Sequence, residues 1–125
     1  DVYKRQSLRD AGISLCAGSD FPIESNDPLI GIDAFCRRVP FGSVNAWYGD
    51  ERISRDEALL AYTEWAHRAA DVSYRRGTLT EGYDADFVVL DRDITSCADG
   101  EIADVRVVAT YCGGRRTYVH EGLTA

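Results

Sequence analysis

Histidine, lysine and long apolar runs are scarce in this chain of 125 residues. The only histidines are His67 and His120, and the only lysine is Lys4. No apolar run approaches the roughly 18–20 residues that a membrane-spanning helix needs, so we expect no membrane partner. The four cysteines form no CxxC pair and have no histidine nearby, which excludes zinc-finger spacing. They are also too few for a dense disulfide framework, so we expect reduced, structural thiols at positions 16, 36, 97 and 112.

The charge balance is acidic, with a net charge of −7, and argues against a phosphate-backbone partner. The basic pair Arg75-Arg76 is too short to form a nucleic-acid-binding stripe. The polar start of the chain shows no signal-peptide pattern. These features predict a soluble, cytoplasmic protein that binds neither nucleic acid nor membrane.

Residues 1–6 raise a separate question, because the codons GAT GTG TAT AAG AGA CAG encode this hexapeptide. That string resembles the end of a transposon adapter used to prepare sequencing libraries. We therefore expect residues 1–6 to be a non-native, adapter-encoded segment without function. The alternative is a genuine polar N-terminal segment.

The N-terminal half has the pattern of an α/β fold. Residues 7–11 are typical of a helix tail, which Gly12 ends. The apolar run 13–17 predicts a strand buried on both faces, as in a parallel sheet. Asp20 follows that strand on a loop, and Asp27 with Pro28 predicts the start of a helix that extends to about residue 38.

The second half changes from helical to strand-like periodicity. Ser54 and Glu57 have the spacing of a capping box, which predicts an amphipathic helix followed by a second one over about 65–70. Beyond Gly77, Gly113-Gly114 is a two-residue hairpin signal. It predicts a small antiparallel β unit with strands over 85–91, 105–112 and 115–120.

Four segments in this order resemble the C-terminal end of the metal-dependent amidohydrolase superfamily. The match is closest to amidohydrolase family 3, the branch that includes N-substituted formamide deformylases. The segments are the loop Ala17-Gly18-Ser19-Asp20-Phe21-Pro22, the capped helix 52–63, the glycine-spaced stretch 77–91 and the hairpin Cys112-Gly113-Gly114-Arg115-Arg116.

The resemblance implies an α/β plus β fold. Residues 7–72 would be the C-terminal end of a (β/α)8 TIM-barrel catalytic domain, with 13–17 as its eighth strand. Residues 73–125 would be the C-terminal part of a small flanking β-sandwich. Asp20 would be the aspartate that binds a divalent metal, expected to be zinc, and that takes and returns protons.

The chemistry of Asp20 agrees with that role. Catalytic groups of TIM barrels lie where strands end, and Asp20 follows the predicted strand. A divalent metal lowers the pKa of bound water toward about 7, and an adjacent carboxylate can accept the proton. In the alternative, Asp20 only caps a loop, and the chain is a free-standing small α/β binding or interaction domain without catalysis.

Other polar residues are weaker candidates. We expect His67 to be structural or on the surface and His120 to be exposed to solvent. Glu24 and Asn26, on the loop after Asp20, are candidates for lining a substrate pocket. We expect structural roles rather than metal binding for the aspartate pairs Asp84 with Asp86 and Asp91 with Asp93.

One carboxylate cannot hold a catalytic zinc, which normally takes three protein ligands. The family takes its other ligands from an H-x-H pair on the first barrel strand and from histidines on strands five and six, and this chain has neither. We therefore expect a fragment of a hydrolase that acts on amide-like, non-peptide C–N bonds of small molecules. Alone it should bind no metal and be inactive. The unpaired strand 13–17 further predicts poor solubility or partial disorder of residues 7–50.

Overall fold

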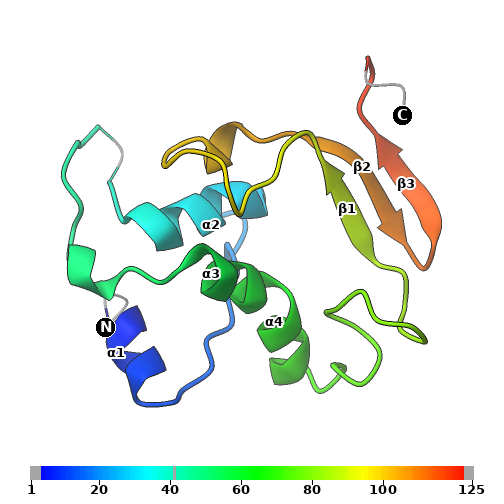
Figure 1. Cartoon of the computed structure of the whole chain (residues 1–125), viewed down its shortest axis with the longest axis horizontal. Coiled ribbons are helices and arrows are strands. Elements are labelled where there is room, and N and C mark those ends of the chain that lie inside the picture. The colour runs from blue at the N-terminus through cyan, green and yellow to red at the C-terminus, as the bar shows by residue number, and fades with distance from the viewer. Residues whose placement is uncertain (1–3, 41, 123–125) are drawn as a thin grey trace.

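The computed structural model describes residues 4–40 and 42–122. Helices occupy the first half of the chain, and a three-stranded sheet lies beside them toward the C-terminal end (Figure 1). None of the described helices has the length and apolar character needed to cross a membrane. The elements in chain order are α1 (Arg5–Asp10), α2 (Pro28–Arg37), the 3-10 turn η1 (Gly49–Glu51), α3 (Arg55–Tyr62), α4 (Glu64–Ala69), β1 (Phe87–Leu90), the 3-10 turn η2 (Ile102–Asp104), β2 (Val107–Cys112) and β3 (Arg115–Val119).

The two main helices begin where the sequence predicts. Before α2, the Asp27 carboxylate accepts a hydrogen bond from the Leu29 N–H at 2.9 Å, and Pro28 takes the first helical position. Before α3, the Glu57 N–H donates to the Ser54 hydroxyl at 3.2 Å, and the Ser54 N–H donates to the Glu57 carboxylate at 3.0 Å. Both predicted caps are confirmed, because each depends on atoms within one turn of chain.

The predicted buried strand over residues 13–17 is wrong for the structure of this chain. The segment leaves α1 through Gly12, whose φ is +79°, and then runs without pairing to β1, β2 or β3. Ile13 is 48% exposed, so the segment is not buried. Its tie to the helices is a hydrogen bond from the Ala17 N–H to the Ala61 carbonyl at 3.0 Å. A strand needs a partner for its backbone groups, and the described part of the chain offers none.

The predicted antiparallel unit is confirmed, with strand order β1-β2-β3. Gly113 and Gly114 both have positive φ, as the tight turn between β2 and β3 requires. This turn also contacts the start of β1. The Gly113 N–H donates to the Asp86 carboxylate at 2.7 Å, and the Gly114 N–H donates to the Ala85 carbonyl at 2.9 Å.

One hydrophobic core joins the helices to the segment between β1 and β2. The α2 side chains Leu29 and Ile32 pack with residues that come from the start of α3 and from the segment around η2. The core therefore draws on chain from both sides of residue 73. Its remaining buried members are Ile53, Ala58, Ile94, Ile102 and Val105.

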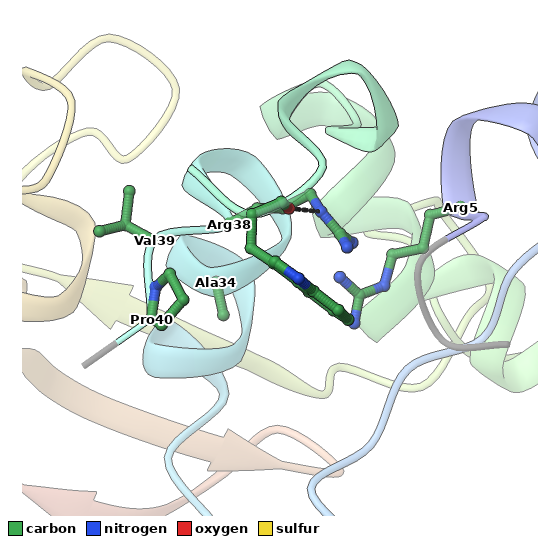
Figure 2. A pocket seen from close by; sticks show the side chains of 6 residues that line it. Arg5, Ala34, Arg38, Val39 and Pro40 are labelled. Carbon is green, nitrogen blue, oxygen red and sulfur yellow. Dashed lines mark hydrogen bonds between the residues drawn. The ribbon is translucent and has the colours of Figure 1, made fainter. Parts of the chain in front are cut away.

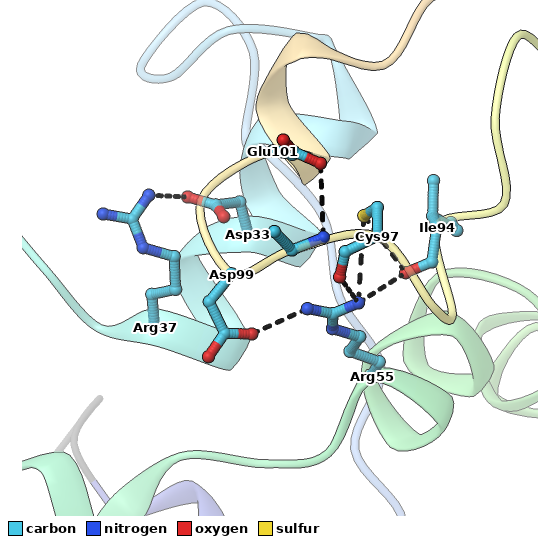
Figure 3. A network of polar contacts seen from close by, with 8 residues as sticks. Asp33, Arg37, Arg55, Ile94, Cys97, Asp99 and Glu101 are labelled. Carbon is cyan, nitrogen blue, oxygen red and sulfur yellow. Dashed lines mark hydrogen bonds and ion pairs between the residues drawn. The ribbon is translucent and has the colours of Figure 1, made fainter.

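Arg55 holds the same two segments together through polar contacts (Figure 3). One of its terminal nitrogens donates to the Cys97 carbonyl at 2.5 Å and to the Ile94 carbonyl at 3.3 Å. The other lies 2.6 Å from the Asp99 carboxylate. Because Arg55 is the first residue of α3, these bonds fix the start of that helix against the 94–99 loop.

Candidate functional site

Asp20 lies at the turn that follows the extended segment 13–17. Its φ is +51°, a left-handed conformation that aspartate adopts more readily than most residues, and its carbonyl accepts the Ile23 N–H at 2.9 Å. The residue is exposed. Among residues 4–40 and 42–122, nothing forms a hydrogen bond or ion pair with its carboxylate. The backbone of Asp20 is thus engaged in the turn while its side chain is open to an external ligand.

A pocket of about 380 Å³ lies beside this turn. Asp20 does not line it, although its neighbours Gly18 and Ser19 do. Glu24 lines the pocket, as we predicted for a substrate pocket, whereas Asn26 does not. The remaining lining residues are Arg5, Ser25, Asp27, Ile30, Gly31, Ala34, Phe35 and Tyr62.

The wall formed by α2 and Tyr62 is tightly packed at Gly31. A Cβ atom at position 31 would overlap the Tyr62 hydroxyl and would lie 2.7 Å from the Tyr62 Cζ. Tyr62 also contacts Phe35, with ring centroids 6.0 Å apart, and the Arg5 guanidinium lies 4.1 Å from the Phe35 centroid. Burial raises the pKa of Tyr62, and the positive charge of Arg5 opposes that rise.

The described residues do not form a metal site by themselves. Within residues 4–40 and 42–122, no group of three or more histidine, cysteine, aspartate or glutamate side chains is placed to hold an ion. A catalytic zinc normally takes three protein ligands. The exposed carboxylate of Asp20 has the right chemistry for one ligand, so any metal bound here needs further ligands from elsewhere.

The surroundings of His67 agree with the sequence prediction, whereas those of His120 do not. The sequence predicts that His67 is structural or on the surface, and its Nδ1 lies 2.7 Å from the carbonyl of Thr63, the residue before α4, in an exposed contact. The solvent exposure predicted for His120 is wrong. The backbone N–H of His120 donates to the Val108 carbonyl at 2.8 Å, which continues the sheet pairing. The side chain is half-buried, and its Nδ1 is buried without a hydrogen-bond partner.

The aspartate pairs have the structural roles that we predicted. Asp84 forms ion pairs with Arg75 at 2.6 Å and Arg76 at 2.7 Å, and these hydrogen bonds lower the pKa of Asp84. The other three carboxylates accept backbone N–H groups. Asp86 is bonded to Gly113, Asp91 to Arg106 at 3.1 Å and Asp93 to Thr95 at 2.8 Å.

The cysteines are free, as predicted. Cys36 and Cys97 are half-buried beside the core, whereas Cys16 and Cys112 are exposed. Burial raises the pKa of the Cys36 thiol to about 11, so this thiol is protonated at neutral pH. A protonated thiol of this kind is inert rather than nucleophilic.

Arg38 is a candidate site residue that no sequence pattern indicated. It directly follows α2, is 6% exposed, and lines a second pocket next to the one described above. The end of α2 and the proline at position 40 together predict that the chain turns here. Neither feature indicates that the charged side chain of Arg38 is buried.

Comparison with known proteins bears out the expected family. Residues 1–118 match the family model described as "Amidohydrolase family". The protein LONG AFTER FAR-RED 3 of Arabidopsis thaliana is 40% identical over 120 residues, which cover 94% of this chain and 20% of that protein. The N-substituted formamide deformylase of Arthrobacter pascens is 33% identical over 122 residues, which cover 97% of this chain and 22% of that protein.

The chain therefore spans about a fifth of the length of the curated relatives it matches. No solved structure matches it. The family match extends from the first residue through the Asp20 turn and the capped helix to β3, which includes every segment that carried the resemblance. This chain belongs to the amidohydrolase family.

Proposed function

We propose that Asp20 is a metal ligand and proton-transfer residue of a hydrolase that cleaves amide-like, non-peptide C–N bonds of small molecules. Family membership supports the reaction class, and a relative named N-substituted formamide deformylase supports an amide-like substrate. The remaining metal ligands would come from polypeptide outside this sequence. Zinc is the proposed metal, since mixed imidazole and carboxylate sites suit it.

The observation that carries this proposal is the place of an unpartnered carboxylate, that of Asp20, on the turn that follows the extended segment and next to residues that line a pocket. A carboxylate that binds a metal or accepts a proton must have an oxygen free for that purpose. The carboxylates of Asp84, Asp86 and Asp93 are all occupied by arginine or backbone donors. Asp20 keeps its own carboxylate free beside a pocket, on a turn whose backbone is fixed. A bound divalent metal would supply an activated water there.

The same proposal accounts for the extended segment before Asp20. Residues 13–17 would be the eighth strand of a TIM barrel, with neighbouring strands supplied by the missing polypeptide and Ile13 buried against them. Residues 7–72 would belong to the barrel domain and residues 73–125 to the flanking β-sandwich. In this arrangement the isolated chain neither binds zinc at catalytic strength nor turns over substrate.

The test is a pair of matched variants in the product of the complete gene. Asp20→Asn should lower kcat/KM for an amide substrate by about 10³-fold and cause loss of the bound metal. Its far-ultraviolet circular dichroism spectrum should be unchanged. Asp71→Asn is the control, because Asp71 is also an exposed aspartate with positive φ, at +57°. It should keep turnover within about threefold of the wild type, as a surface change away from the site. Near-normal turnover in Asp20→Asn would refute the assignment.

Sequencing the intact locus distinguishes this proposal from a free-standing binding domain. An H-x-H motif about 300 or more residues upstream, as typical barrel length requires, supports the hydrolase. A start codon near Ser7 supports the binding domain. The same sequence tests whether residues 1–6 are adapter-encoded, as we propose, because native codons for them would overturn that idea.

A further inference from the structure

A pocket of about 210 Å³ lies at the C-terminal end of α2 (Figure 2). Two arginines and four mainly apolar residues line it. The arginines are Arg5 and Arg38, and the others are Ala34, Val39, Pro40 and Trp47. Asp20 is not among them.

Arg38 is the chemically unusual part of this wall. Its backbone closes α2 with a φ of +52°, and its N–H donates to the Ala34 carbonyl at 3.1 Å. Only 6% of the residue is exposed. The side-chain Nε donates to the Trp47 carbonyl at 2.9 Å, but Nη1 is buried without a hydrogen-bond partner. A buried guanidinium is costly unless its charge and its donors are matched.

The surroundings of Arg38 supply only part of that match. The guanidinium carbon lies 5.5 Å from the centroid of the Trp47 ring, which is a cation–π contact. Figure 2 shows the Arg5 side chain directed toward Arg38 across the pocket, and the charge of Arg38 adds to burial in lowering the pKa of Arg5. Glu51 is an acidic neighbour whose negative charge interacts with Arg38, while its oxygens accept the Ser7 hydroxyl at 2.5 Å and the Ser7 N–H at 3.0 Å. Across the described ranges, no carboxylate lies within ion-pair distance of Arg38 or Arg5. In the part of the chain that the structure describes, the two guanidinium groups thus have one interacting carboxylate, Glu51, between them, which leaves the pocket with an excess of positive charge.

We infer that this pocket binds the carboxylate of a small anion that carries a short apolar tail. A carboxylate matches the planar guanidinium fork and offsets the buried charge. The apolar tail fits the walls formed by Ala34, Val39 and Trp47. Inorganic phosphate is the poorer fit, since it has no apolar part to occupy these walls.

The inference rests on Arg38 rather than on Arg5. Arg5 belongs to the segment that we propose is adapter-encoded, so its contribution is secondary. It adds positive charge to the pocket lining, whereas Arg38 supplies the buried, unpartnered donor.

Fluorescence of Trp47 provides the test, in a Trp65→Phe background where Trp47 is the remaining tryptophan. Titration with butanoate should give a saturable change, and butanamide, the uncharged analogue of similar shape, should give none. Inorganic phosphate should bind at least about tenfold more weakly than butanoate. Absence of saturation by butanoate, or an equal response to butanamide, overturns the inference. Phosphate binding as tight as that of butanoate overturns the carboxylate class.

Variants then assign the site. Arg38→Gln should weaken butanoate binding at least about tenfold, as expected for loss of a charge-assisted bond. Arg38→Lys keeps the charge but loses the fork, so it should also bind more weakly than the wild type. Arg115→Gln removes the same charge from an exposed position on β3 and should leave affinity unchanged. Undiminished binding by folded Arg38→Gln and Arg38→Lys would place the ligand elsewhere, as would a loss confined to Arg5→Ala.

Discussion

Replacing Gly31 with alanine has two opposite effects on the free energy of unfolding. Gly31 lies inside α2, where alanine is favoured over glycine by about 1 kcal/mol. The new methyl group would overlap the Tyr62 hydroxyl and approach Cζ to 2.7 Å, so the half-buried tyrosine or the helix must move. Overpacking of this kind costs about 1–3 kcal/mol. We therefore expect Gly31→Ala to lower the free energy of unfolding by about 1 kcal/mol, which is opposite in sign to the helix-propensity effect.

A double-mutant cycle with Tyr62→Ala separates the two effects. Without the tyrosine ring, Gly31→Ala should become stabilising by about 1 kcal/mol, because only helix propensity remains. Amide hydrogen exchange along α2 is the assay, since it measures local stability even if global unfolding is not cooperative. Gly18→Ala is the control, because a Cβ at position 18 would meet nothing within 4 Å. Equal effects of Gly31→Ala in both backgrounds would refute the packing argument.

Three further predictions concern stability. Burial raises the pKa of the Cys36 thiol to about 11 from its ordinary value near 9.0. Between these two pH values the thiol keeps its proton in the folded state and loses it in the unfolded state. Stability should fall as pH rises through that interval, and urea midpoints of wild type and Cys36→Ala should converge if the thiol is responsible. Ser54→Ala removes the cap of α3 and should cost about 1 kcal/mol, seen as a lower urea midpoint, while an unchanged midpoint would contradict the cap's importance. Within residues 7–50, for which the sequence predicts partial disorder, the segment 13–27 should show poorly dispersed amide signals when the chain is expressed alone. The segment around Ile13 has no strand partner in the described structure, whereas α2 packs into the core; sharp, dispersed signals from 13–27 would contradict this.

The features that the sequence predicted correctly are the local ones. The Asp27 and Ser54 caps and the Gly113-Gly114 turn each depend on residues a few positions apart. Such hydrogen bonds form in the same way whatever the rest of the chain does, so a short pattern is enough to predict them. The structural role of Asp84 also has a local basis, since its partner Arg75 is nine positions earlier, whereas Asp86 bonds to Gly113 across the β unit.

The features that the sequence did not predict depend on distant partners. An apolar run such as 13–17 indicates a buried strand only when other strands lie beside it. The packing of Ile94 and Ile102 on α2 joins segments that no periodicity connects. The burial of Arg38 has the same origin, since its guanidinium contacts Trp47, nine positions further along the chain. For Asp20, the sequence indicated its place after an extended segment, whereas its free carboxylate became evident only from the contacts of its neighbours.

The hydrogen bonds of the Gly113-Gly114 turn have a consequence for protein engineering. An exposed hairpin tip of small residues is ordinarily a good site for inserting a tag or opening the chain for circular permutation. Here both turn amides are bonded to residues 85 and 86, so the tip also acts as a clamp on the entry to β1. Lengthening the turn would release that clamp and the register of two strand pairs at once. Insertions that preserve the fold are better placed in the exposed 43–45 stretch, where the chain forms no pairing with the sheet.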